Sequence, residues 1–186
     1  MASDFVFDII NKEYAGNPRL RELLLTHSEC VARKALTIVE ECRLQDSVDV
    51  RFVEDAAMLH DVGVIMTDAP SIFCHGEKPY ICHGVEGRKI LDRYGLPDAF
   101  GLVCERHTGA GITRDEVISA RLPLPPADYL PLSIEEKLIC YADKFFSKSR
   151  DPRQEKSLQQ VINSMKRFGP AVESRFLKLH ELFSPT

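Results

Sequence analysis

The chain has 186 residues, 44% of them hydrophobic, and a formal net charge of −4. An acidic protein does not attract nucleic acid as a whole, so a nucleic-acid partner bound through a basic surface is disfavoured. No apolar run is long enough to span a bilayer, and the amino-terminal residues lack the basic and apolar regions of a signal peptide. We therefore expect a cytoplasmic protein with no membrane partner, whose length suits one domain.

Apolar residues recur at every third or fourth position along most of the chain, a spacing typical of amphipathic helices. Runs that alternate strictly between polar and apolar residues are scarce, so the pattern predicts an all-α fold. Proline and glycine indicate a long loop over residues 64–82 and a rigid connection over residues 122–132. The expected helices cover residues 4–14, 18–43, 49–61, 83–94, 97–107, 113–120, 133–147 and 154–183, the last of them broken at Gly169-Pro170.

A histidine lies on the apolar stripe of the second predicted helix. His27 follows Leu20 and Leu24 and precedes Val31 and Ala35, all at steps of three or four residues. Residues at this spacing share one helix face, so the side chain of His27 should point into the core.

The adjacent pair His60 and Asp61 ends the third predicted helix. His60 falls four residues after Ala56 and seven after Val53, which places it on the buried face, with Asp61 at its edge. Burial of an unpaired carboxylate is strongly unfavourable, so Asp61 needs a partner, and a metal ion would serve. Alone, such a pair is more often a core histidine followed by an ordinary aspartate.

Three further candidates follow along the chain, each on the apolar face of its helix. His83 opens the helix after the long loop, and His107 ends the next one. Asp143 lies near the end of a helix that Ser133 and Glu136 are expected to begin as a capping box. Imidazole and carboxylate together suit iron, manganese, zinc and similar divalent metals, and not calcium. The set therefore predicts a metal site between helices.

Cysteine is a second class of metal ligand in this chain. The six cysteines are spread out, and several fall on predicted core helices, so reduced and buried thiols are expected. Cys74-His75 and Cys82-His83 offer the ligand types of a structural zinc, but their spacing is not that of a familiar zinc finger. Because His83 is better used beside the other histidines, the zinc site is the weaker prediction.

The order H…HD…H…H…D resembles the HD-domain superfamily of metal-dependent phosphohydrolases, in the version with two histidines between the HD pair and the final aspartate. The local motifs HDVG, HGVEGRKIL and YADKF carry the resemblance, which spans residues 27–143. It implies a single-domain HD-type helical bundle over residues 1–186, with the metal-site core at about 18–147 and carboxy-terminal helices at about 154–183. The segment ERHTGAGITRDEV and the proline-rich stretch after it resemble a group of small, uncharacterised archaeal and bacterial HD proteins.

Six ligands are too many for one tetrahedral site and predict two divalent metal ions, with iron the first choice and manganese, nickel, zinc or magnesium as alternatives. In such a pair the metals lower the pKa of a shared water towards about 7, and the hydroxide attacks phosphorus. Asp61 would bridge the two metals and is the predicted catalytic residue. The expected ligands are His27, His60, Asp61 and Asp143 on one metal, and His83, His107 and the second oxygen of Asp61 on the other.

Residues adjacent to the predicted ligands are candidates for substrate contacts. The basic side chains of Arg106 and Lys144 can hold a phosphate, and Gly109 allows the backbone to approach a ligand closely. Three further basic residues follow Lys144, namely Lys148, Arg150 and Arg153, and each of them is more typical of a solvated helix end. The four predicted substrate-binding residues are Arg106, Thr108, Gly109 and Lys144.

Three functions remain open. The first is a phosphohydrolase for a small phosphorylated molecule, a nucleotide or dinucleotide, because the ligand pattern resembles that of a bacterial family that splits diadenosine tetraphosphate. The second is a di-iron HD-type oxygenase that cleaves a C–C or C–P bond with the same six ligands. The third is a nucleotide-sensing domain that is not catalytic. A homodimer is compatible with each of them.

Overall fold

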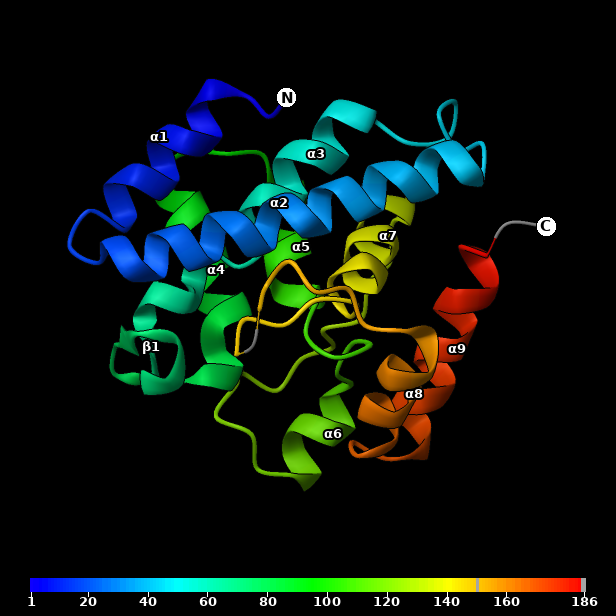
Figure 1. The fold of residues 1–186 in the computed structure, drawn as a ribbon. Helices are drawn as coiled ribbons and strands as arrows, with labels where there is room; N and C mark the ends of the chain where they lie inside the picture. The colour runs from blue at the N-terminus through cyan, green and yellow to red at the C-terminus, as the bar shows by residue number, and fades with distance from the viewer. Residues whose placement is uncertain (150, 185–186) are drawn as a thin grey trace.

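The structure is a computed structural model that describes residues 1–149 and 151–184, so Arg150 lies outside the described residues. Helices make up most of it, and the all-α prediction is confirmed (Figure 1). None of the described helices combines the length and the apolar character needed to cross a membrane. The helices are α1 (Asp4–Glu13), α2 (Pro18–Glu41), α3 (Val50–Leu59), α4 (His83–Arg93), α5 (Asp98–Arg106), α6 (Arg114–Ser119), α7 (Ile134–Asp143), α8 (Leu158–Lys166) and α9 (Pro170–Leu182).

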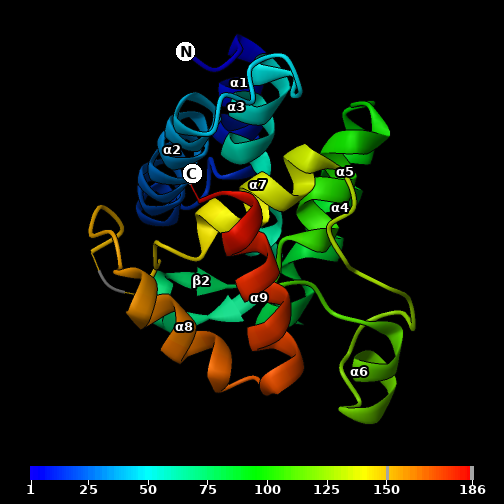
Figure 2. The same ribbon diagram turned by 90° about the vertical axis from the view of Figure 1, so that its right-hand side faces the viewer.

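Helix α2 crosses the molecule and organises the core (Figure 1). It packs against α3 and α7, while α4 and α5 form a second packed pair. Helices α8 and α9 form a hairpin on the side of the molecule opposite α1, and α9 packs against α7 (Figure 2). The site described below lies where α2, α3, α4, α5 and α7 meet.

Capping residues set where the carboxy-terminal helices begin. The sequence predicts a helix from residue 154, but α8 starts at Leu158 because Ser157 and Gln160 form a capping box there. The predicted break is confirmed at Gly169, whose φ of +106° favours glycine. Ser133 caps α7 by accepting a hydrogen bond from the third residue of the helix, as expected.

The predicted loop over residues 64–82 is wrong in detail, because the segment contains regular structure. Three 3-10 turns, η1 (Val62–Met66), η2 (Pro70–Ile72) and η3 (Tyr80–Cys82), alternate with β1 (Thr67–Ala69), β2 (Cys74–His75) and β3 (Lys78–Pro79). The strand order is β2-β1-β3, with β1 antiparallel to β2 and parallel to β3. Strands of two or three residues are too short to produce an alternating pattern that could be recognised in the sequence.

Two glycines bring η1 against the first turns of α4. A Cβ atom at Gly63 would lie 2.1 Å from the carbonyl oxygen of His83 and 2.2 Å from the backbone nitrogen of Gly87. The space beside Gly87 is filled by the backbone of Gly63 and the side chain of Cys104, whose atoms would each lie 3.3 Å from a Cβ atom at Gly87. This close crossing fixes the distance between Asp61, just before η1, and His83 at the start of α4.

We predict that Gly63→Ala lowers the free energy of unfolding by about 3 kcal/mol or more, because the new methyl group would overlap backbone atoms that cannot move away independently. Chemical denaturation measures the change. Gly16→Ala is the matched control, since a Cβ there meets nothing within 4 Å. Equal stability of the two variants would contradict the crossing.

Candidate metal centre

The structure brings the six predicted ligands together from five helices. His27 lies in the middle of α2, His60 and Asp61 follow α3, His83 opens α4, His107 follows α5, and Asp143 ends α7. All six are buried, with at most 9% of any of them exposed. Their proximity is an observation, whereas their role as ligands stays a prediction.

The first group of ligand atoms comes from α2, α3 and α7. The Nε2 atom of His27 lies 3.2 Å from Oδ2 of Asp61 and 3.0 Å from Oδ1 of Asp143. The Nε2 atom of His60 lies 3.0 Å and 3.5 Å from the same two oxygens. Two imidazoles and two carboxylates therefore converge on one point that could hold a cation.

The second group lies on the other side of Asp61. Its Oδ1 atom is 3.5 Å from Nε2 of His83 and 3.4 Å from Nε2 of His107. The two Nε2 atoms are 3.0 Å apart. Each carboxylate oxygen of Asp61 thus faces one group, which is the arrangement that a bridging ligand requires.

The backbone fixes the orientation of three of the four imidazoles. The Nδ1 atoms of His60, His83 and His107 lie 2.6, 2.7 and 2.8 Å from carbonyl oxygens three residues earlier in the chain. A carbonyl only accepts, so Nδ1 carries the proton and, in the neutral ring, Nε2 presents a lone pair to the site.

With the imidazoles neutral, as metal binding requires, several of these lone pairs have no hydrogen atom to face. Among the described residues, Nε2 of His60 and Oδ1 of Asp61 are buried without a hydrogen-bond partner. Buried polar atoms are normally satisfied, and facing lone pairs 3.0 Å apart repel each other, as between His83 and His107. A divalent cation in each group would provide a partner for the buried atoms and would remove the repulsion between the facing lone pairs. The residues therefore fit a two-metal site.

The environment keeps most of these groups in the form that binds metals. Burial and the neighbouring His107 lower the pKa of His83 to about 3, and burial also lowers the pKa of His107. Burial alone would raise the pKa of Asp61, but Lys148 and the surrounding histidines hold it well below its usual range. For His60, burial opposes the charged form, yet the carboxylates of Asp61 and Asp143 raise its pKa to about 9. A metal would displace that proton.

Two lysines lie against the carboxylates. The ammonium of Lys144 is 2.6 Å from Oδ2 of Asp143 and donates to the carbonyl of His107 at 2.8 Å. Lys148 donates to Oδ2 of Asp61, and its side chain is only 12% exposed. The structure therefore brings the predicted substrate residue Lys144 to the site and adds Lys148, for which the sequence predicts a solvated helix end.

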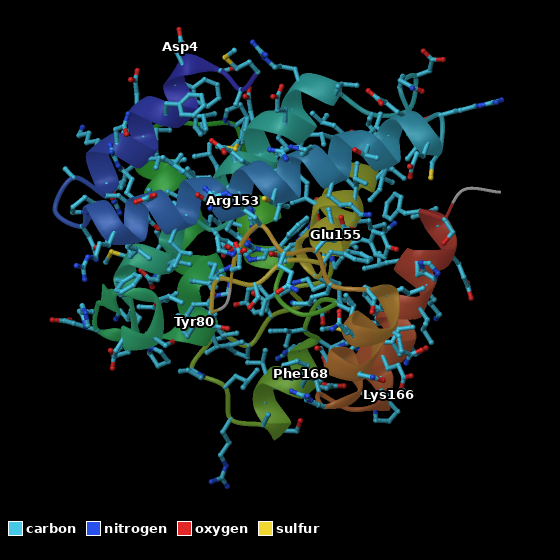
Figure 3. The ribbon with its side chains drawn as sticks, in the orientation of Figure 1. Asp4, Tyr80, Arg153, Glu155, Lys166 and Phe168 are labelled. Atoms are coloured by element: carbon cyan, nitrogen blue, oxygen red, sulfur yellow. The ribbon has the colours of Figure 1, made fainter. Side chains whose placement is uncertain are left out.

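The contact between Lys148 and Asp61 depends on a change of backbone direction, which a helical pattern does not predict. In a helix that continued to residue 147, Lys148 would project about 140° away from Asp143. Helix α7 ends at Asp143 instead, and the turns that follow lead Lys148 back to Asp61. Arg153 belongs to the same basic run but lies over α2, at a surface cavity with Cys30 and Lys34 (Figure 3).

Arg106, which was expected to contact the substrate, is paired with a carboxylate on another helix instead. Its guanidinium donates to both carboxylate oxygens of Glu136, at 3.3 and 3.0 Å. Glu136 also accepts from the N–H of Leu132, so it does not complete the capping box predicted with Ser133. Arg106 thus joins α5 to α7 and is not found among the described residues that line the two cavities at the site.

Two cavities open beside the ligands. One, of about 390 Å³, is lined by Asp143, Lys144 and Lys148. The other, of about 490 Å³, is lined by His83 and Thr108, and Gly109 borders both. The predicted contacts Thr108, Gly109 and Lys144 therefore all face space that a ligand could occupy.

The alternative zinc site is not formed by the described residues. The sulfur of Cys74 lies 2.8 Å from the carbonyl oxygens of both Val64 and Thr67, either of which can accept its single proton, and the thiol of Cys82 donates to the carbonyl of Pro123 at 3.2 Å. These cysteines are satisfied by the backbone, and all six cysteines are free.

Comparison with known proteins identifies the family. The model of the HD domain family matches residues 24–147, more than half of the chain. The chain therefore belongs to the HD domain family. Family membership and the clustered histidines and aspartates support a metal-dependent hydrolase.

Three relatives in sequence are archaeal proteins. An uncharacterized protein of Methanocaldococcus jannaschii is 45% identical over 96 residues, which cover 52% of this chain and 49% of that protein. Two tRNA (cytidine(56)-2'-O)-methyltransferases also match: that of Thermoplasma volcanium is 30% identical over 88% of this chain and 42% of its own length, and that of Picrophilus torridus is 35% identical over 69% and 33%. The chain thus spans less than half the length of each of these relatives.

Solved structures share the fold. The HD domain of the Listeria monocytogenes phosphodiesterase PgpH has a TM-score of 0.53 and 17% identity, over 95% of this chain and 86% of that one. Its complex with cyclic-di-AMP has the same TM-score and 16% identity, over 96% and 84%. At this identity the comparison establishes the HD-type helical fold.

We predict that removal of metal by a chelator destabilises the protein, because the facing lone pairs lose their cations. At a metal concentration about a hundredfold above Kd, the thermal midpoint should rise by about 5–10 °C relative to the metal-free protein. Scanning calorimetry with Fe²⁺, Mn²⁺ and Ca²⁺ measures the effect, with calcium as the control of unsuitable chemistry. Identical midpoints with and without Fe²⁺ or Mn²⁺ would exclude the metal centre.

Proposed function

We propose that the protein is a metal-dependent phosphohydrolase that acts on a small phosphorylated molecule, a nucleotide or dinucleotide. The proposal includes two divalent metal ions, with iron the first choice, held by the six side chains in the two groups described above. The cytoplasmic location, the absence of a nucleic-acid partner and the homodimer stay predictions.

The pairing of lysines with the ligand carboxylates is the observation that carries this proposal. Lys144 contacts Asp143, and Lys148 contacts Asp61, and both lysines line the cavity of about 390 Å³. Once cations take the charge of the carboxylates, both ammonium groups become available to an anionic ligand. A cavity with two lysines beside two cations suits a phosphate group better than a neutral one.

The histidines and the lysines of the site have different roles in the proposed reaction. His60, His83 and His107 are held by backbone carbonyls, so their Nε2 atoms stay aimed at the cations. Lys144 and Lys148 would orient the phosphate and stabilise the negative charge that develops on its oxygens. When bound, the two metals supply an activated water and further compensation of that charge.

The cysteines near the site are unsuited to act as nucleophiles. Burial raises the pKa of Cys140 to about 11, and its thiol contacts the carbonyls of His107 and Gly109 at 3.4 and 3.5 Å. Cys104 is also buried, its pKa is raised by burial, and it donates to the carbonyl of Leu59. Both thiols stay protonated near neutral pH, which leaves water as the nucleophile.

Asp61→Asn tests the bridging role. We predict that the metal content falls from two ions per chain to at most one, and that phosphate release falls about a thousandfold, because an amide offers a single oxygen without charge. Metal analysis, circular dichroism and a phosphate assay measure these properties. Asp68→Asn, at an exposed position on β1, is the control. Two ions and full activity in Asp61→Asn would refute the bridge.

Lys148→Met tests the phosphate contact. We expect kcat/KM to fall about a hundredfold while two metals remain bound, because methionine keeps the length of the side chain and loses the charge. Lys166→Met serves as the control, since Lys166 is exposed on the outer hairpin (Figure 3). An unchanged kcat/KM in Lys148→Met would remove Lys148 from the site of reaction.

An anaerobic screen separates hydrolysis from oxygen chemistry. Protein purified without added metal is analysed for its ions and incubated without oxygen with nucleotides, dinucleotides and sugar phosphates. The proposal predicts release of phosphate, or of a shorter phosphate compound, from at least one of them. Consumption of dioxygen with no hydrolysis of any phosphate would favour the oxygenase alternative instead.

A further inference from the structure

The two cavities at the site share a wall. Tyr80, Gly109 and Phe168 line both the cavity of about 390 Å³ and that of about 490 Å³. Tyr80 also stacks on the imidazole of His83, with ring centroids 4.8 Å apart, which ties the wall to the candidate metal centre. The two cavities are therefore neighbouring parts of one cleft.

The two parts differ in chemical character. The smaller cavity is mixed: apolar side chains such as Ile72, Phe146 and Met165 line it together with Asp143, three lysines and four serines. The larger one is lined mainly by apolar residues, namely Ile81, Ile112, Ala120, Leu122 and Val172. A ligand that fills the cleft would place its charged group on the lysine side and an apolar group on the other side.

One charged residue lies in the apolar part, and its charge is already compensated. Both carboxylate oxygens of Glu116 accept from Arg175 at 2.9 Å, and one also accepts from the N–H of Thr113 at 2.8 Å. The same guanidinium donates to the carbonyls of Ala110 and Gly111 at 3.2 and 3.0 Å. Arg175 thus fastens α9 to α6 and to the turn beside the cavity.

Phe168 reaches this cleft from outside the segment that matches the HD family. The match ends at residue 147, whereas Phe168 lies in the turn between α8 and α9, just before Gly169. Figure 3 shows Phe168 between the hairpin and α6, on the same side of the molecule as Tyr80. Its side chain is 69% exposed. A single exposed aromatic ring is unremarkable elsewhere, but this one borders both cavities.

We propose that Phe168 and Tyr80 determine substrate specificity by holding an aromatic or other apolar group of the substrate in the larger cavity while its phosphate lies at the lysines. The inference rests on the proposed phosphohydrolase function, which it extends. The volume of about 490 Å³ lies within the range of small-molecule pockets, and His83 in its wall places the apolar group next to the reacting phosphate.

Two phosphonates test this inference by binding alone, because neither of them is a phosphate ester. Calorimetry compares phenylphosphonate with methylphosphonate on the metal-loaded protein. We expect phenylphosphonate to bind about tenfold more tightly, because its ring becomes buried in the larger cavity. Phe168→Ala should lose most of this preference, whereas Leu182→Ala, an exposed position on the outer face of the hairpin, should keep it.

The ratio of the two affinities distinguishes a specificity role from a structural one. Damage to the fold or to the metals would weaken both phosphonates equally and leave the ratio unchanged in Phe168→Ala, which would overturn the proposal. Equal affinities in the unmodified protein would overturn it too. Failure of the proposed function has a separate signature: phenyl phosphate would not be hydrolysed, although an aromatic preference dependent on Phe168 would still support the specificity role.

Discussion

The burial of one carboxylate constrains the rest of this structure. Asp61 is fully buried, and its two oxygens face different groups of ligands. A buried charge without partners is too unfavourable to persist, so helices from distant parts of the chain must supply cations or cation ligands around it. The close crossing at Gly63, the hydrogen-bonded imidazoles and the ammonium of Lys148 all follow from this requirement.

The clustering of these six side chains could be predicted from the sequence because it depends on local periodicity. Each predicted ligand lies on the apolar face of a helix or directly continues that face at the end of the helix, and such a face can be identified without knowledge of how the helices pack. The HD family match, over residues 24–147, contains all six residues. The all-α fold and the break at Gly169 followed from the same kind of local signal.

The positions of the basic residues and the wall of the cleft depend on contacts between distant segments of the chain, which local sequence patterns do not predict. Lys148 reaches Asp61 only because α7 ends early, and Arg106 is withdrawn from the site by Glu136 on another helix. The cleft wall needs Phe168 from the hairpin, which no motif connects with Tyr80. The metal-binding core of the chain is thus encoded locally, whereas its substrate cleft arises from tertiary packing.

The positions of the bound metals show whether Asp61 bridges two ions. A crystal of the metal-loaded protein, measured at the absorption edge of the bound metal, yields an anomalous difference map. We expect two peaks about 3.5–4 Å apart, with one oxygen of Asp61 on each. A single peak, or metal bound away from Asp61, would contradict it.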